Sequence, residues 1–197
     1  MGTPLHPTLI VGVGASAGGL KAFSALLEAL PANTGIALVM VSHLYPAAHS
    51  YLAEILSDYT KMPVVVASEK QRIHANHVYV IPPDADLLIE TDTLRVVSPR
   101  SKANVQIDLF FSSLALAMGP RAVGIVLSGY DGDGTEGCRR IKAKGGTTFA
   151  QDVSAQVNLM PLSARASGSV DHVLPPAKIA RALVRLAKKA LKRGSKS

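Results

Sequence analysis

Three short polar segments carry the residue types that hydrolytic chemistry needs. Ser16 lies in GASAGG, His43 in SHLYP, and Asp131 and Asp133 lie in SGYDGDG. A serine hydroxyl, an imidazole and a carboxylate can serve as a nucleophile, its general base and the acid that orients the base. They can act together only if the fold brings the three segments to one place.

Apolar runs rich in β-branched residues precede these segments and predict the strands of a sheet. Nearly unbroken hydrophobicity is typical of parallel strands that are covered on both faces. The predicted strands span residues 8–14, 36–43, 62–68, 77–83, 122–129, 147–152 and 171–175. Helical spacing predicts helices at about 17–30, 47–59, 106–118, 134–144 and 177–192.

This alternation indicates an α/β fold with three α/β/α layers, in which a doubly wound, mostly parallel sheet carries helices on both faces. The segment DADLLIETDTLRVVS alternates around a polar centre and predicts a small antiparallel hairpin. Ligand sites of such folds lie beyond the carboxyl ends of the strands. Ser16, His43 and the two aspartates all follow predicted strands, so we expect them to meet at that edge.

The turn in LIVGVGASAGGLKAF is open to three interpretations. GVGASA fits the loose dinucleotide fingerprint, but the second strand ends in Val41-Ser42-His43 without the acid that would hold a ribose. GASAG fits G-x-S-x-G, a strained strand-to-helix turn that exposes a serine. Alternatively, the glycines and an N-cap serine need no function. His43 at the end of the next strand favours the nucleophile.

Composition places bounds on the function. The 197 residues, 48% of them apolar, predict one domain over 1–197, with a core at about 8–176 and a basic terminal helix at 177–192. Eight of the 21 basic residues lie between Lys178 and Lys196, and the remaining 13 nearly balance the 14 acidic residues. A docked helix with a solvated basic face is therefore favoured over an acidic partner or a membrane surface, and we expect no nucleic-acid partner and no membrane insertion.

Other polar residues predict no metal site and no organic cofactor. His74 and His77 have metal-compatible spacing, but no third ligand is evident near them. DGDGTEG resembles the start of a calcium loop, yet counting from Asp131 places Glu136 and Lys142 where an EF-hand needs glycine and glutamate. The single cysteine, Cys138, could be activated at a helix start, but a packed small side chain is the favoured role.

The order of several motifs resembles one known family. GASAGG, SHLYPAAHSYLAEIL, HVYVIPPDADL, VLSGYDGDGTEG and AQDVSAQVNLMPLSARASGSVDHVLPP are similar, from about Leu9 to Pro176, to the catalytic domain of bacterial chemotaxis protein-glutamate methylesterases of the CheB type. The resemblance implies a cytoplasmic serine hydrolase that demethylates γ-glutamyl methyl esters on chemoreceptor helices and in many members deamidates glutamines. It implies Ser16 as nucleophile, His43 as base and Asp133 as acid.

Backbone N–H groups near Ala17 and Tyr130 are our candidates for the oxyanion hole of this predicted enzyme. No receiver domain is evident, so a separate regulatory protein is a further possible partner. A catalytically inactive receptor-binding relative and a dinucleotide-binding protein remain the alternative functions.

The sequence departs from the family pattern at two places near the predicted site. Tyr130-Asp131 replaces a usual Met-Gly or Thr-Gly, which adds a second carboxylate two residues before Asp133. Leu159-Met160-Pro161-Leu162 replaces a usual Gly-Met-Pro-Arg turn. The departures leave the expected triad intact, but they put the usual receptor substrate in question.

Overall fold

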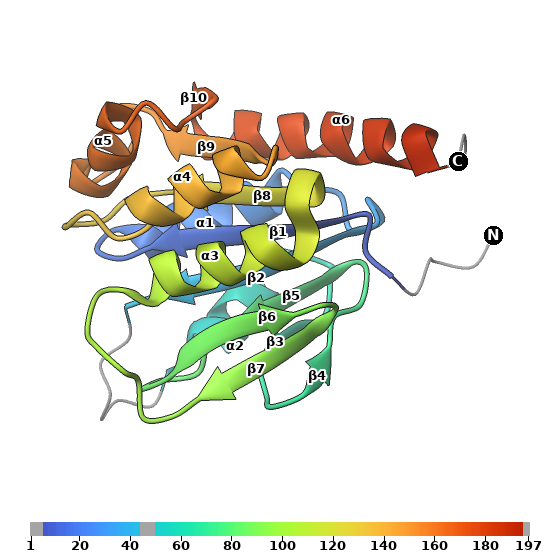
Figure 1. The fold of residues 1–197 in the computed structure, drawn as a ribbon, viewed down its shortest axis with the longest axis horizontal. Helices are drawn as coiled ribbons and strands as arrows, with labels where there is room; N and C mark the ends of the chain where they lie inside the picture. The colour runs from blue at the N-terminus through green and yellow to red at the C-terminus, as the bar shows by residue number, and fades with distance from the viewer. Residues whose placement is uncertain (1–5, 44–49, 195–197) are drawn as a thin grey trace.

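The computed structural model describes residues 6–43 and 50–194 as an α/β fold built around a parallel sheet (Figure 1). In this part of the chain, seven strands form the sheet in the order β10-β9-β8-β1-β2-β5-β3. Their bounds are β1 Leu9–Ala15, β2 Ile36–Ser42, β3 Val64–Val66, β5 His77–Val80, β8 Ala122–Val126, β9 Thr147–Gln151 and β10 His172–Leu174. All neighbouring pairs are parallel, as predicted.

Helices cover both faces of this sheet. Their bounds are α1 Gly19–Glu28, α2 Leu52–Ser57, α3 Gln106–Met118, α4 Thr135–Ala143, α5 Leu159–Ala166 and α6 Pro176–Gly194, with a 3-10 turn η1 at Gly119–Arg121. The apolar side chains of α1, α2 and α6 enter one buried cluster, and those of α3, α4 and α5 enter another. The sheet therefore separates two cores, which confirms the predicted layers.

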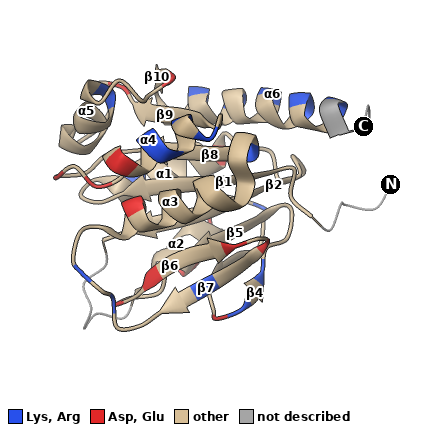
Figure 2. Ribbon diagram, in the orientation of Figure 1, with Lys and Arg blue, Asp and Glu red and all other residues tan. Residues whose placement is uncertain are grey.

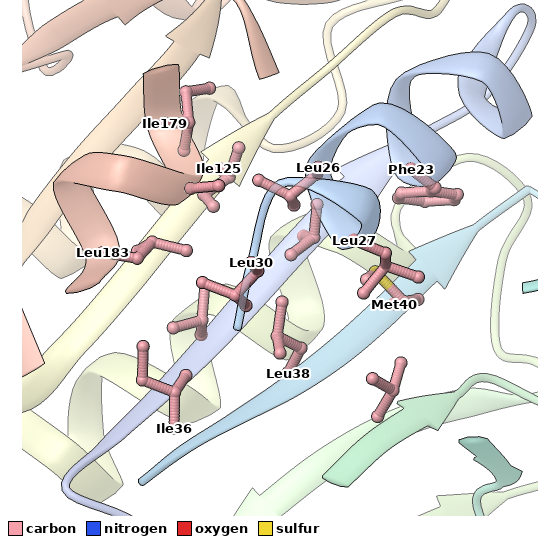
Figure 3. Packing of buried hydrophobic residues seen from close by; sticks show 14 of the residues in the cluster. Phe23, Leu26, Leu27, Leu30, Ile36, Leu38, Met40, Ile125, Ile179 and Leu183 are labelled. Atoms are coloured by element: carbon pink, nitrogen blue, oxygen red, sulfur yellow. The ribbon is translucent and has the colours of Figure 1, made fainter. Parts of the chain in front are cut away.

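The first core shows how the sequence pattern fixes this arrangement. Leu26 of α1 lies on the side of Ile179 and Leu183 of α6, while Leu27 lies beside Met40 of β2 (Figure 3), and all of these side chains are buried. Phe23, Leu30, Ile36, Leu38 and Ile125 complete the labelled group. Lys and Arg lie along the outer side of α6 (Figure 2), so the predicted docking of a basic terminal helix through its apolar face is confirmed.

A second, smaller sheet lies outside the main one, in the order β4-β7-β6. It consists of β4 Gln71–Arg72, β6 Asp86–Glu90 and β7 Thr93–Val97. β6 and β7 are antiparallel and form the predicted hairpin, while β4 was not expected from the sequence.

The predictions for two helices need correction. The helix predicted at 47–59 is observed only as α2, and residues 44–49 lie outside the described part of the chain. α5 was missed, because the family resemblance suggested a turn at Leu159-Met160-Pro161-Leu162. Proline is tolerated in the first turn of a helix, where its missing N–H would have no intrahelical partner. No helix in residues 6–43 and 50–194 is long and apolar enough to cross a membrane.

Candidate functional site

The candidate site lies where the direction of strand addition reverses. β2 follows β1 on one side, while β8 lies on the other side of β1. Crevices at such a reversal, beyond the carboxyl ends of the strands, are the usual ligand sites of doubly wound sheets. Ser16 comes directly after β1, which places it at this point.

Strand register brings Ser16 beside His43. Ala15 of β1 pairs with Ser42 of β2 in the parallel ladder. Ser16 and His43 directly follow this pair, so they lie next to each other at the ends of two adjacent strands. Adjacent strands lie about 4.8 Å apart, and paired residues project their side chains to the same face. The His43 side chain is 8% exposed, which fixes the ring at the edge of the core.

The His43 ring contacts the predicted acid directly. Its Nε2 lies 2.7 Å from Oδ2 of Asp133, whose side chain is completely buried. An ionised carboxylate can only accept hydrogen bonds, so Nε2–H is the donor. The other ring nitrogen, Nδ1, then carries the lone pair of the neutral ring and can act as a proton acceptor.

The carboxylate of Asp133 accepts hydrogen bonds from the backbone of α3 and from Gly134, the residue before α4. Its Oδ2 accepts the N–H of Ile107 at 3.0 Å, and its Oδ1 accepts the N–H groups of Asp108 at 2.8 Å and Gly134 at 2.9 Å. Ile107 and Asp108 lie in the first turn of α3, whose N–H groups have no intrahelical partners. The positive end of the helix dipole also favours a negative charge there. This anchoring was not foreseen from the sequence.

Asp108 makes the same kind of interaction with the next helix, α4. Its Oδ1 accepts the N–H of Gly137 in the first turn of α4 at 2.7 Å. Burial and the nearby charge of Asp133 raise the pKa of Asp108, in part opposed by the hydrogen bond from Gly137. The two aspartates thus connect α3, α4 and the loop between β8 and α4, and they fix the angle at which Asp133 meets His43.

The turn that carries Ser16 is made by backbone hydrogen bonds. The Ser16 N–H donates to the Ser128 carbonyl and the Gly19 N–H donates to the Ser16 carbonyl, both at 2.9 Å. Gly18 has φ +73° and ψ +3°, the values of the third residue of a type II turn. The strained position predicted at the serine therefore falls on Gly18, and Ser16 is not among the positive-φ residues.

A buried hydroxyl and a glycine connect this turn to neighbouring loops. Ser128 Oγ lies 2.8 Å from the Ala17 carbonyl and accepts the Val157 N–H at 3.0 Å. A methyl group on Gly129 would lie 3.0 Å from Ser16 Cβ, so the chain before Tyr130 contacts Ser16 closely. Ser128 was not singled out in the sequence, where nothing distinguished it from other small residues in turns.

The two predicted oxyanion donors differ in their surroundings. The backbone of Ala17 lies inside the turn after Ser16, whereas Tyr130 directly follows Gly129, where an added methyl group would meet the Ser16 side chain. The Tyr130 side chain is 59% exposed at the rim. Because the Ser16 N–H is used by Ser128, the candidate donors remain Ala17 and Tyr130.

The glycines of the dinucleotide fingerprint have a packing role instead. Gly12 and Gly14 lie within β1, and added methyl groups would come within 2.7 Å of Phe111 and 2.4 Å of Ile107, both of α3. They therefore admit α3 close to the sheet. In the dinucleotide fold, such glycines shape the turn around a pyrophosphate, so this observation disfavours the dinucleotide alternative.

The residues considered for metal or thiol chemistry are His74, His77 and Cys138. The His77 ring contacts the Ala75 carbonyl through Nδ1 and lies 5.6 Å from the His74 ring, centre to centre. Among the described residues, no group of three or more His, Cys, Asp or Glu side chains could hold a metal ion. Burial, with a contribution from the charge of Asp108, raises the pKa of Cys138 to about 12, so its thiol is not activated.

Comparison with known proteins gives consistent similarities. A family model described as CheB methylesterase matches residues 11–183. A Leptospira interrogans protein, provisionally named a protein-glutamate methylesterase/protein-glutamine glutaminase, is 35% identical over 88% of this chain and 92% of its own length. A Burkholderia orbicola protein with the same type of name is 37% identical over 91% of the chain but only 54% of its own length.

A solved structure shares the fold closely. The Thermotoga maritima CheB methylesterase catalytic domain superposes with a TM-score of 0.82 and 28% sequence identity. The match covers 90% of this chain and 98% of that domain. The chain therefore spans about half of the Burkholderia protein and nearly all of the solved catalytic domain.

Proposed function

Because the chain belongs to the CheB methylesterase family of carboxylic ester hydrolases, we propose that it hydrolyses γ-glutamyl methyl esters on the cytoplasmic helices of chemoreceptors with Ser16, His43 and Asp133. The observation that carries this proposal is the combination of the Ala15–Ser42 register with the 2.7 Å contact between His43 Nε2 and Asp133. The register supports a position of Ser16 next to His43, and the contact supports Asp133 as the group that orients the imidazole.

The proposed acylation begins when Ser16 Oγ attacks the ester carbonyl and its proton passes to His43 Nδ1. Asp133 holds the ring in the tautomer that presents Nδ1 to the serine and stabilises the imidazolium that forms. The N–H groups of Ala17 and Tyr130 stabilise the oxyanion, each worth about 3–4 kcal/mol in comparable sites. His43 then returns the proton to the methoxide, and methanol leaves.

Deacylation reverses the roles with water as the attacking group. His43 takes a proton from water as the water oxygen attacks the acyl carbon, and it then gives this proton to Ser16 Oγ as the acyl–oxygen bond breaks, which releases glutamate and restores Ser16. None of these steps draws on a metal or an organic cofactor. The same acyl-enzyme would form from a glutamine side chain with loss of ammonia, and the relatives' names include protein-glutamine glutaminase. We therefore include glutamine deamidation as a second activity.

We further propose that the protein acts in the cytoplasm and that a separate regulatory protein controls it. A γ-glutamyl ester on a receptor's cytoplasmic helix is accessible only from that compartment. The single cysteine, which excludes an internal disulfide, agrees with a reducing environment.

The test combines a probe of the serine with a measurement of product. A fluorophosphonate should label the wild-type chain, and Ser16→Ala should abolish labelling. Methanol release from methylated chemoreceptor cytoplasmic domains should fall to background in Ser16→Ala and His43→Ala. A folded wild-type chain that is not labelled would favour the alternative of an inactive receptor-binding protein. Unchanged methanol release by His43→Ala would contradict the assignment of the base.

A further inference from the structure

A second carboxylate faces the His43 ring from the side opposite Asp133. Asp131 Oδ2 lies 3.6 Å from Nδ1, while Asp133 binds Nε2. The imidazole therefore lies between two aspartates of one loop. Nδ1 is also the nitrogen to which the proposed mechanism assigns the Ser16 proton, so Asp131 is adjacent to the atom where charge appears during the reaction.

Local structure fixes the Asp131 carboxylate in this position. Its Oδ1 accepts the backbone N–H of Asp133 at 3.0 Å, which forms an Asx turn. The backbone has φ +51°, in the left-handed region that glycine adopts freely and that aspartate and asparagine tolerate better than other residues. The side chain is 32% exposed, so solvent reaches the carboxylate only in part.

We infer that Asp131 is a positioning residue that stabilises the protonated His43 ring during acylation and deacylation, an inference that rests on the proposed function. In the resting state Nδ1 presents a lone pair to Ser16, and the Asp131 carboxylate has no favourable interaction with that lone pair. After proton transfer, Nδ1–H carries positive charge toward Asp131 Oδ2. The interaction is thus stronger in the transition state than in the ground state, which is the condition for accelerating the chemical step.

The other charges around the ring do not replace this contribution. Asp133 binds the opposite nitrogen, and Asp108 of α3 lies behind Asp133 and binds Gly137. Glu136 of α4 is paired with Arg139 and Arg140. On the β2 side, Ser42 lines a small cavity together with Arg100 and Asp84, which are paired with each other. Among these charged groups, Asp131 is the one in contact with Nδ1.

The same geometry predicts a pH signature. An imidazolium between two carboxylates releases its proton less readily than one beside a single carboxylate, and only the neutral ring can accept the Ser16 proton. Removing the Asp131 charge should therefore extend activity to lower pH and reduce the maximal rate. A purely structural role for Asp131 would change protein stability or the amount of active protein, without moving the pH profile.

Asp131→Asn is the discriminating variant, because asparagine keeps the shape, the Asx acceptor and the tolerance for positive φ. The full chain is labelled with a fluorophosphonate from pH 4 to pH 9, and the labelling rate is measured. We expect the acidic limb to move down by about half a pH unit or more, and the maximal rate to fall about three- to tenfold, after allowance for partial exposure. Asp131→Gly should behave alike, which guards against a folding defect peculiar to asparagine.

Glu136→Gln is the matched control, because it removes a carboxylate five residues away that is paired with arginines. Its pH profile should equal that of the wild type. A labelled wild type with an unchanged profile in both Asp131 variants would overturn the inference alone. A folded wild type that is not labelled at any pH would overturn the proposed function and this inference together.

Discussion

The turn after β1 carries Ser16 and the loop after β8 carries Asp133 to the same edge of the sheet, but the two segments are held in place in different ways. The turn is fixed by the backbone hydrogen bond from Gly19 to Ser16 and by Gly18 at φ +73°, together with one long-range backbone hydrogen bond from Ser16 to Ser128. The loop is fixed by a buried carboxylate, Asp133, that binds N–H groups of a helix more than twenty residues earlier in the chain. The conformation of the turn is thus set mainly by its own residues, while that of the loop depends on tertiary packing.

This difference separates two ways in which a site can fail. A substitution in the turn should mainly lower the free energy of unfolding, because the new residue must adopt a strained backbone conformation. Damage to the loop should first cost activity, because the charge that orients His43 is lost while the surrounding backbone persists. Variants at single positions in each region can test this separation.

The largest effect is expected from Asp133→Asn. An amide cannot accept from Nε2–H and from the N–H groups of α3 as a carboxylate does, so the ring is no longer held in the productive tautomer. The fluorophosphonate labelling rate should fall about 10⁴-fold, as in other triads that lose their acid. A loss below tenfold in a folded variant would show that Asp133 does not orient the base.

Gly18→Ala should be the most destabilising change in the turn. Alanine at positive φ costs about 1–2 kcal/mol, and its methyl group would lie 2.6 Å from Ser128 Oγ. We expect the free energy of unfolding in urea to fall by about 2–4 kcal/mol, with overpacking adding to the backbone term.

Gly168→Ala supplies the matched control for Gly18. Gly168 has the same φ of +73°, but a methyl group there would meet no atom within 4 Å. Its cost should therefore be the backbone term alone, about 1–2 kcal/mol. Equal losses in the two variants would show that the contact between the turn and Ser128 contributes nothing.

Ser128→Ala tests the connection between the two regions. The change leaves the partly buried N–H of Val157 without its hydroxyl acceptor and removes the hydrogen bond to the Ala17 carbonyl. We expect a loss of about 1–3 kcal/mol in unfolding free energy, with a smaller loss of labelling rate than in Asp133→Asn. Ser57→Ala, the same change at an exposed hydroxyl, should be near neutral. A Ser128 variant as stable as this control would contradict the proposed connection.

The contrast between local and long-range structure also explains what the sequence could predict. Apolar runs predicted the parallel strands and their polar ends, so Ser16 and His43 could be expected at the same edge of the sheet, while the adjacency of β1 and β2 came from the structure. The anchoring of Asp133 by α3 was not readable, because it depends on how close Gly12 and Gly14 allow that helix to approach the sheet. Sequence spacing does not encode that distance.

The role of Ser128 and the contact of Asp131 with His43 also could not be predicted from the sequence. Ser128 is completely buried and holds the turn after β1, but as a small residue at a strand end its sequence context has no distinctive pattern. The contact of Asp131 with Nδ1 depends on a positive φ that the sequence suggests only through the unusual residue at that position. In both cases the partner is determined by tertiary structure.

Asp108→Asn should have the smallest effect, and its sign depends on pH. The pKa of Asp108 is raised by burial and by the charge of Asp133, so the folded protein disfavours its ionised form. Such a group stabilises the fold below its unfolded pKa of about 3.9, and this contribution is lost as pH rises through the higher folded value. Asparagine keeps an acceptor for Gly137 without the charge. From pH 3 to pH 7, the free energy of unfolding of the variant should therefore rise relative to that of the wild type. The expected rise is only about 0.5 kcal/mol, because partial exposure screens the charge. Urea unfolding at both pH values measures this difference, and a relative gain toward low pH would mean that the α3 dipole outweighs the repulsion from Asp133.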